Sequence, residues 1–180
     1  MNQIYTHPKR KTKVVFVQLG SPSEPTTKAL RKYLRKFLGD PRVVDINPWL
    51  WKIILNFFVL PFRPKKSAKL YARIWDGKSF PLITNTRDFT NNVREELKKI
   101  DPEGHVEVNH AFLLSPPYVN EVYDSWEDDL KKGIGATKLL VIPMFPQYSE
   151  STIASGIDAL AKELSKRVKI PTFEVITNFH

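Results

Sequence analysis

Short runs of β-branched and apolar residues alternate with longer segments whose apolar residues recur at helical spacing. The strand-like runs lie at 13–19, 105–112, 139–144 and 172–176. Helical spacing fills segments at about 27–38, 87–99, 116–132 and 151–166. Buried strands that alternate with helices are typical of a parallel sheet covered on both faces. The sequence therefore predicts an α/β fold with a four-stranded parallel sheet, in a Rossmann-like arrangement.

The first predicted helix has two contrasting faces. Its apolar side consists of Leu30, Tyr33, Leu34, Phe37 and Leu38, and its opposite side is covered by Arg31, Lys32, Arg35 and Lys36. Thr26 or Thr27 can cap the beginning of this helix, and Gly39 with Pro41 ends it. We expect the apolar side to pack inward and the basic side to face solvent.

The segment NPWLWKIILNFFVLPFRPKK at 47–66 combines dense apolar character with a basic end. Helical spacing predicts a helix over 49–62, ended by Pro64, with a separate short helix after it. Lys52 and Asn56 interrupt the apolar run, which is shorter than the ~18 residues that a membrane span needs. Apolar residues surround nearly the whole predicted helix, and the segment at about 45–66 is an insertion between the first helix and the next strand, outside the minimal β-α-β pattern. Three interpretations remain open: a core helix, a partner-binding face, or a patch at a membrane surface.

Composition and charge narrow the class of partner. The chain has 180 residues, 42% of them hydrophobic, which suits one globular domain. Its net charge of +9 favours anionic partners: acidic small molecules, acidic membrane surfaces or nucleic acid. Residues 1–12 read as a flexible basic tail and 13–180 as one lobe. The chain has no cysteine, which excludes disulfides and thiolate metal sites. We expect a cytoplasmic location, either free or at the periphery of a membrane.

The sequence motifs offer few candidates for a ligand-binding or catalytic site. Ligands of such sheets bind outside the carboxyl ends of the strands, here in the loops at 19–22, 113–116 and 145–152. The hydroxyl-rich third loop could hold an anion or could simply cap a helix. The glycines form no phosphate-binding fingerprint and the four histidines lack metal-ligand spacing, so we expect neither a nucleotide cofactor nor a metal site.

Several motifs, taken together and in order, resemble the N-terminal half of ferrochelatase, the enzyme that inserts ferrous iron into a porphyrin. They are VQLGSP at Val17–Pro22, YLRKFL at Tyr33–Leu38, DPRVV at Asp40–Val44, LPFRPKKSA at Leu60–Ala68, YARIW at Tyr71–Trp75, FPL at Phe80–Leu82 and FPQYSEST at Phe145–Thr152. The resemblance implies a lobe of a two-lobed α/β protein with a porphyrin cleft between the lobes.

The resemblance also implies roles for particular residues. Leu19, Tyr71 and Ser151 match positions in the cleft, and Arg63 matches an arginine that meets a porphyrin propionate. The apolar lip over the cleft would comprise Trp49, Trp51, Phe57, Phe58 and Phe62. The implied partners are protoporphyrin or coproporphyrin and a C-terminal lobe, with ferrous iron as a substrate and no cofactor bound by this chain.

Departures from the family pattern limit what these residues are expected to do. The histidine and glutamate motifs that carry the family's catalysis do not occur in the 180 residues. We therefore expect no catalytic residue and no chelatase activity in the isolated chain. Phe80 stands where a serine is usual, and Ala111 where many members have arginine.

A non-catalytic function is the alternative. The chain could be a module that binds a tetrapyrrole or an acidic membrane surface through the lip. Nucleic acid is disfavoured, because the basic residues lack interleaved aromatic residues. An apolar face left without its second lobe would also favour homo-oligomers.

Overall fold

A computed structural model describes residues 11–133 and 135–178, and almost all of the predicted basic tail lies outside these ranges. Four parallel strands form one sheet in the order β2-β1-β3-β4. Their bounds are β1 (Thr12–Gln18), β2 (Val106–Phe112), β3 (Lys138–Pro143) and β4 (Thr172–Val175). The predicted fold class and all four predicted strands are confirmed.

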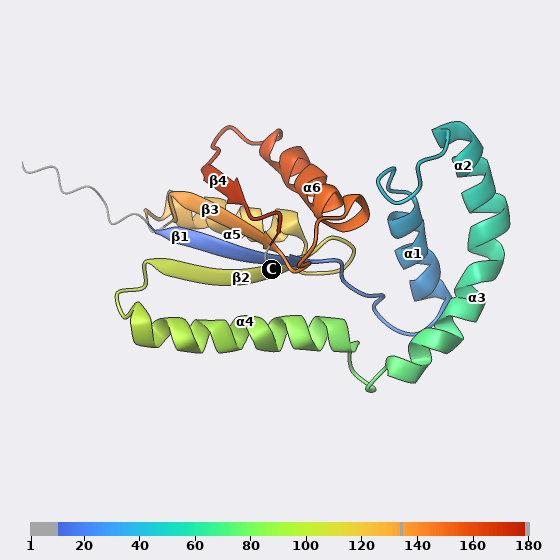
Figure 1. Cartoon of the computed structure of the whole chain (residues 1–180), viewed down its shortest axis with the longest axis horizontal. Coiled ribbons are helices and arrows are strands. Elements are labelled where there is room, and N and C mark those ends of the chain that lie inside the picture. Colours follow the sequence, from blue (N-terminus) through green and yellow to red (C-terminus); the bar gives the residue numbers. More distant parts are fainter. Residues whose placement is uncertain (1–10, 134, 179–180) are drawn as a thin grey trace, which may run out of the picture.

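Helices cover both faces of this sheet, as Figure 1 shows, with α4 on one face and α5 and α6 on the other. The α-helices are α1 (Thr27–Leu38), α2 (Pro48–Ile54), α3 (Leu60–Tyr71), α4 (Pro81–Ile100), α5 (Val119–Lys131) and α6 (Ser155–Leu164). Shorter helical turns are η1 (Leu55–Val59), η2 (Ala72–Ile74) and η3 (Glu150–Ala154).

The core follows the alternation of side chains along β1. Val14 and Phe16 point toward α4, where the ring of Phe16 meets Phe89 edge-on at 5.1 Å between centroids. Val15 and Val17 point to the other face and pack in a cluster with Trp126 of α5 and residues of α6. A continuous apolar strand buried on both faces is what a parallel sheet requires.

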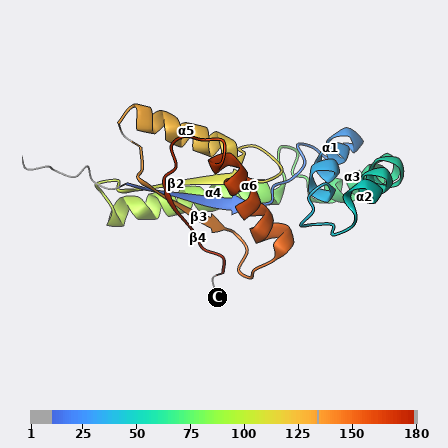
Figure 2. The same ribbon diagram turned by 90° about the horizontal axis from the view of Figure 1, so that it is seen from above.

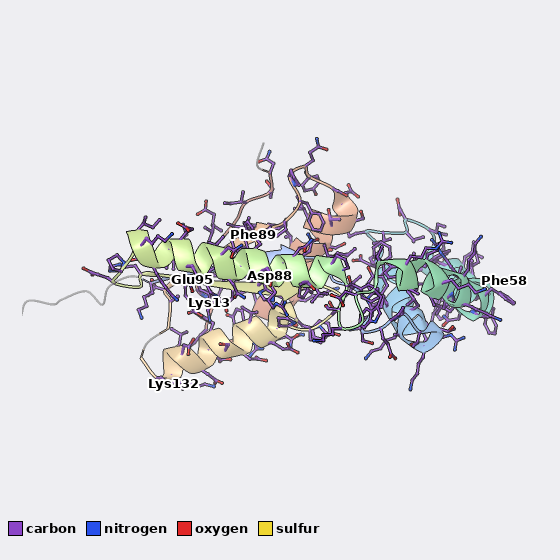
Figure 3. All side chains as sticks on the ribbon, turned by 90° about the horizontal axis from the view of Figure 1, so that it is seen from below. Lys13, Phe58, Asp88, Phe89, Glu95 and Lys132 are labelled. Carbon is purple, nitrogen blue, oxygen red and sulfur yellow. The ribbon has the colours of Figure 1, made fainter. Side chains whose placement is uncertain are left out.

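Lys13 interrupts this apolar pattern on the face covered by α5. Its side chain is only 1% exposed, and its ammonium lies 3.3 Å from a carboxylate oxygen of Glu107 and 3.6 Å from one of Asp129. Figure 3 labels Lys13 within the body of the molecule. A buried ammonium needs such partners because desolvation of an unpaired charge is very costly.

Residues 27–75, from α1 through η2, form what we call the helical arm. Figures 1 and 2 both show it projecting beyond the carboxyl ends of the strands. In the arm, α1 packs on α3 through a cluster that contains Tyr33, Leu34 and Leu38 of α1 with Leu55 and Leu60. Thr26 caps α1 by accepting a hydrogen bond from the Ala29 N–H at 3.2 Å, as the sequence predicts.

The predicted helix break at Pro64 is wrong, because α2, η1 and α3 follow one another without interruption. Proline at this position removes the N–H that would bond the Leu60 carbonyl one turn earlier. That carbonyl instead accepts a hydrogen bond from the guanidinium Nε of Arg31 at 3.1 Å. A side chain of the neighbouring helix thus replaces the missing backbone donor, and the helix continues.

Two predicted helix boundaries also differ. Helix α4 begins at Pro81, where proline suits the first turn, and not near Arg87. Helix α5 begins at Val119, three residues after the predicted start at Pro116. The backbone N–H of Tyr118 donates to the carboxylate of Glu121 at 3.0 Å, which fixes the start of α5.

Candidate functional site

The strand order places a crevice between β1 and β3. The chain runs from β1 outward to β2, then crosses back to β3 and β4 on the other side of β1. Open α/β sheets bind ligands at such a switch in direction, outside the carboxyl ends of the strands. Leu19 directly follows β1, and Ser151 lies in η3 after β3. These two residues were predicted to belong to one site.

A cavity of about 410 Å³ opens at this position, which we call the cleft. Leu19 and Ser151 both line it, so the structure brings together two of the predicted site residues. The other walls come from the end of α1, the loop after it, the loop after β2, and α6; they include Phe37, Val43, Leu113, Tyr118, Ser155 and Asp158.

The turn after β1 fixes the position of Leu19. Gly20 has φ +92°, a backbone conformation that residues with a Cβ rarely adopt. A Cβ added at this position would also lie only 2.4 Å from Ser115 Oγ. The Leu19 carbonyl accepts the Leu114 N–H at 3.0 Å, and the Gln18 carbonyl accepts the Leu113 N–H at the same distance. The loops after β1 and β2 are thus joined by backbone hydrogen bonds beneath the cleft.

Hydroxyl groups and charges lie along one face of the helix on the opposite wall. Ser151, Ser155 and Asp158 follow one another at spacings of four and three residues, so they share one side of η3 and α6. The hydroxyls of Ser151 and Ser149 lie 3.1 Å apart. This spacing is a sequence signal that could have added Ser155 and Asp158 to the predicted site.

An ion pair joins the arm to α6 at the cleft. The Arg42 guanidinium donates two hydrogen bonds to the Asp158 carboxylate, at 2.9 and 3.3 Å. These bonds hold the pKa of Asp158 below its usual value. Bidentate pairing fixes orientation as well as distance, so the pair sets the position of the loop after α1 relative to α6.

Most of the lip is exposed to solvent. Trp49, Phe57, Phe58 and Phe62 have 66–79% of their surface exposed, and Leu50 and Ile53 are about half exposed. We call these six residues the outer stripe. Phe58 lies at the far end of the arm from the sheet in Figure 3. The interpretation of the lip as an ordinary core helix is therefore wrong for these side chains.

Trp51 behaves differently from the other predicted lip residues. It is partly buried against the core of the arm, and its indole N–H donates to the Leu38 carbonyl at 2.6 Å. Tryptophan N–H groups usually find such a partner when they are buried. This contact anchors the lip helix to the end of α1.

Tyr71 and Arg63 do not line the cleft. Tyr71 is half-buried and contacts Tyr33 and Phe80, with ring centroids 6.2 and 5.5 Å apart. Burial raises the pKa of Tyr33, and its hydroxyl donates to the Gly20 carbonyl at 3.4 Å. Arg63 is exposed on α3. The structure thus divides the predicted residues between the cleft and the arm.

Charge is concentrated in the arm. Residues 27–75 hold twelve Lys and Arg residues against two Asp, a net charge of +10 in a chain whose total is +9. Apart from the pair of Arg42 with Asp158, the salt bridges among the described residues lie outside the arm. Such a surface attracts anions over a distance of about 10 Å at moderate ionic strength.

Two classes of site were also searched for within residues 11–133 and 135–178. In these ranges no group of three or more His, Cys, Asp or Glu side chains is arranged to hold a metal ion. No helix there is both long enough and apolar enough to cross a bilayer.

The family model and the similar proteins all point to one family. The family model for ferrochelatase matches residues 11–180. The chain is 42% identical over 167 residues to the ferrochelatase of Idiomarina loihiensis, which covers 93% of this chain and 44% of that protein. It is 37% identical over 171 residues to the coproporphyrin III ferrochelatase of Streptococcus mutans, covering 95% of this chain and 51% of the relative.

The matches cover nearly all of this chain but only about half of each relative. A third relative, the ferrochelatase of Teredinibacter turnerae, is 38% identical over 99% of this chain but only 48% of its own length. The chain thus spans about half the length of the curated relatives it matches. With the family model matched along nearly all its residues, the chain belongs to the ferrochelatase family.

Proposed function

We propose that this chain is the porphyrin-binding lobe of a ferrochelatase, acting on ferrous iron and a porphyrin as substrates. The observation that carries the proposal is the convergence of Leu19 and Ser151 in an open cleft beside an arm that is both aromatic and cationic. A porphyrin is a flat apolar ring with acidic side arms. Aromatic surface suits the ring, and guanidinium groups suit the carboxylates.

The division of residues between cleft and arm suggests a division of roles. Leu19 offers an apolar floor and Ser151 a hydroxyl at one edge of the ring. Arg63, exposed on α3 beside Phe62, offers a bidentate partner for a propionate. The outer stripe would cover the face of the ring that the cleft leaves open.

Metal insertion requires a base that removes the pyrrole protons as the distorted ring accepts iron. No described residue that lines the cleft is a histidine. We therefore assign this lobe to binding and positioning, and the proton-accepting step to groups outside these residues. The chain alone is expected to form no metalloporphyrin from ferrous iron and protoporphyrin; metal insertion by the purified chain would contradict this assignment.

Porphyrin binding can be tested directly from the Soret absorption band. Protoporphyrin and coproporphyrin would be titrated into the chain, into Arg63→Ala, and into Lys69→Ala as a matched control on the same helix. Loss of a charge-assisted hydrogen bond predicts about tenfold weaker binding for Arg63→Ala. An unchanged affinity would remove Arg63 from the site, and the absence of a spectral change with the unaltered chain would refute the proposal.

A second candidate function follows from the outer stripe alone. Exposed aromatic residues next to cationic ones are typical of surfaces that bind anionic bilayers. If the arm binds membranes without binding porphyrin, the chain should float with vesicles that contain phosphatidylserine, and less so at high salt. Phe57→Ser combined with Phe58→Ser should abolish flotation. Porphyrin binding that survives those changes would favour the cleft over the membrane interpretation.

A further inference from the structure

A second cavity, of about 320 Å³, lies on the other side of the wall formed by Leu114 and Tyr118. These two residues line both cavities and separate the second one from the cleft. One side of the second cavity is α1, and the opposite side is the loop from Trp75 to Phe80. Its size is within the range of ordinary small-molecule pockets.

Three lysines line this cavity. Lys32 and Lys36 lie one turn apart on α1, and Lys78 lies on the loop opposite. Among the described residues that line the cavity, none is Asp or Glu. The neighbouring Asp76 is already engaged, because its carboxylate accepts the backbone N–H groups of Lys78 and Ser79 at 2.7 and 2.6 Å. The same two bonds lower the pKa of Asp76.

The three lysines are exposed and lack carboxylate partners among the described residues. None of the three forms an ion pair with a residue in the described part of the chain. The Lys36 ammonium instead donates to the Tyr118 hydroxyl at 3.0 Å and lies 4.4 Å from the centre of that ring. Like charges one helical turn apart on a helix repel each other weakly, and an anion bound between Lys32 and Lys36 would offset that repulsion.

Neutral groups complete the walls. Ser21, Ser23, Ser79 and Ser115 place hydroxyl-bearing residues around the same space, and the Ser21 N–H donates to Ser115 Oγ at 3.3 Å. Trp75 supplies a flat apolar surface and is held in place by an edge-on contact with Phe80, 4.7 Å between ring centroids. The walls thus offer cations, hydroxyls and an aromatic plane together.

We propose that this cavity binds a small organic anion, with its carboxylate or phosphate between Lys32, Lys36 and Lys78 and its flat body against Trp75. The acidic group could belong to a separate small molecule or to a side arm of a porphyrin that reaches past Tyr118. Both sources present the same chemistry to the three ammonium groups. The proposal does not depend on porphyrin binding in the cleft.

Phenyl phosphate is a suitable probe, because it joins an anion to an aromatic ring, and phenol is its neutral counterpart. Calorimetric titration should show saturable binding of phenyl phosphate and none of phenol. The double variant Lys32→Gln with Lys78→Gln should weaken binding at least tenfold, since it removes two charge-assisted contacts. Lys28→Gln, an exposed lysine of α1 that does not line the cavity, should stay within twofold.

Equal loss in Lys28→Gln and the double variant, or no saturable binding by the unaltered chain, would overturn the proposal. Circular dichroism of each variant would confirm that the fold persists. A porphyrin titration at saturating phenyl phosphate identifies the source: competition indicates a porphyrin side arm, and simultaneous binding indicates a separate molecule. A chain that binds phenyl phosphate but no porphyrin would refute the proposed function and leave this site standing.

Discussion

At the scale of single residues, Lys13 shows how a charge is accommodated inside the sheet. Its two carboxylate partners are themselves partly exposed, with side chains 50% and 27% accessible, so only the ammonium loses its water. Burying one charge against two solvated ones gives a small net gain or none. The aliphatic stem of Lys13 contributes by filling space next to α5.

Replacement of Lys13 should therefore depend on volume more than on charge. Lys13→Met keeps the stem, and we expect its free energy of unfolding to lie within about 1 kcal/mol of the unaltered chain. Lys13→Ala leaves a cavity and should cost about 2–4 kcal/mol. Urea denaturation of both variants measures the difference. Equal losses of several kcal/mol in both would show that the ion pairs, not the packing, stabilise this position.

The pair of Arg42 with Asp158 should respond to acid. The pKa of Asp158 in the folded chain lies below the usual 3.8, because the Arg42 guanidinium donates hydrogen bonds to its carboxylate. A lowered pKa means that the stabilisation is complete above pH 3.8 and is lost as the pH falls through the folded-state value. A carboxylate NMR titration should show this pKa moving back up in Arg42→Gln. An unchanged pKa would mean that Arg42 is not the cause.

Residues at the cleft show what a sequence can and cannot locate. The loops that contain Leu19 and Ser151 could be located because each follows a buried strand, and parallel strands bring their carboxyl ends together. The choice of these two residues within the loops came from the resemblance to ferrochelatase. Trp51 could not be told from Trp49, since its burial depends on a hydrogen bond to the Leu38 carbonyl, thirteen residues away. Whether Arg63 and Tyr71 contact a ligand stays a prediction.

At the scale of elements, a side chain of α1 supplies the hydrogen bond that a proline of α3 cannot make. The Arg31 guanidinium donates to the Leu60 carbonyl in place of the backbone N–H that Pro64 lacks. Strand and helix positions follow from periodicity, and these predictions are confirmed for β1 to β4 and for α1 and α6. The helix end predicted at Pro64 is wrong, because the effect of Pro64 on the helix depends on Arg31, which lies on α1. A local pattern cannot reveal a donor that only the packing of α1 on α3 supplies.

A double-mutant cycle tests this exchange. Arg31→Met removes the donor and should cost about 1–2 kcal/mol of stability, since the Leu60 carbonyl then lacks a partner. In a Pro64→Ala background, the restored backbone N–H can bond the same carbonyl, so the cost of Arg31→Met should fall to about half or less. Thermal or urea denaturation of the four proteins gives the coupling. Additive effects would refute the proposed replacement of one donor by the other.

At the scale of the whole molecule, charge and exposed apolar surface are gathered in the same region. The arm carries a net charge of +10 together with the outer stripe, and the rest of the chain is nearly neutral. A smaller apolar group, which includes Ile170 and Phe173, is exposed near β4. Exposed apolar patches of this kind are typical of interaction surfaces.

Measurements of self-association should show whether the outer stripe or the apolar group near β4 forms contacts between copies of the chain. We expect the sedimentation coefficient to rise with protein concentration, and more strongly at high salt, because screening weakens the repulsion between two basic arms. Phe57→Ser with Phe58→Ser should suppress the rise if the outer stripe is the contact, whereas Phe173→Ser serves as the control at β4. Suppression by Phe173→Ser alone would move the contact to β4. A coefficient independent of concentration would exclude association through either surface.

The wide helical turn at Leu55–Val59 has a consequence for how this arm can vary. A turn of this type accommodates one more residue than a regular α-helix does. Removing that residue would rotate everything downstream by about 100° around the helix axis. Buried Leu60 and Pro64 would swing outward, and Phe62 and Arg63 would leave their present side. The alignment of Trp49, Leu50 and Ile53 with Phe62 and Arg63 is thus a matter of segment length, and deletion of the single codon for Asn56 would undo it without substituting any residue of the outer stripe.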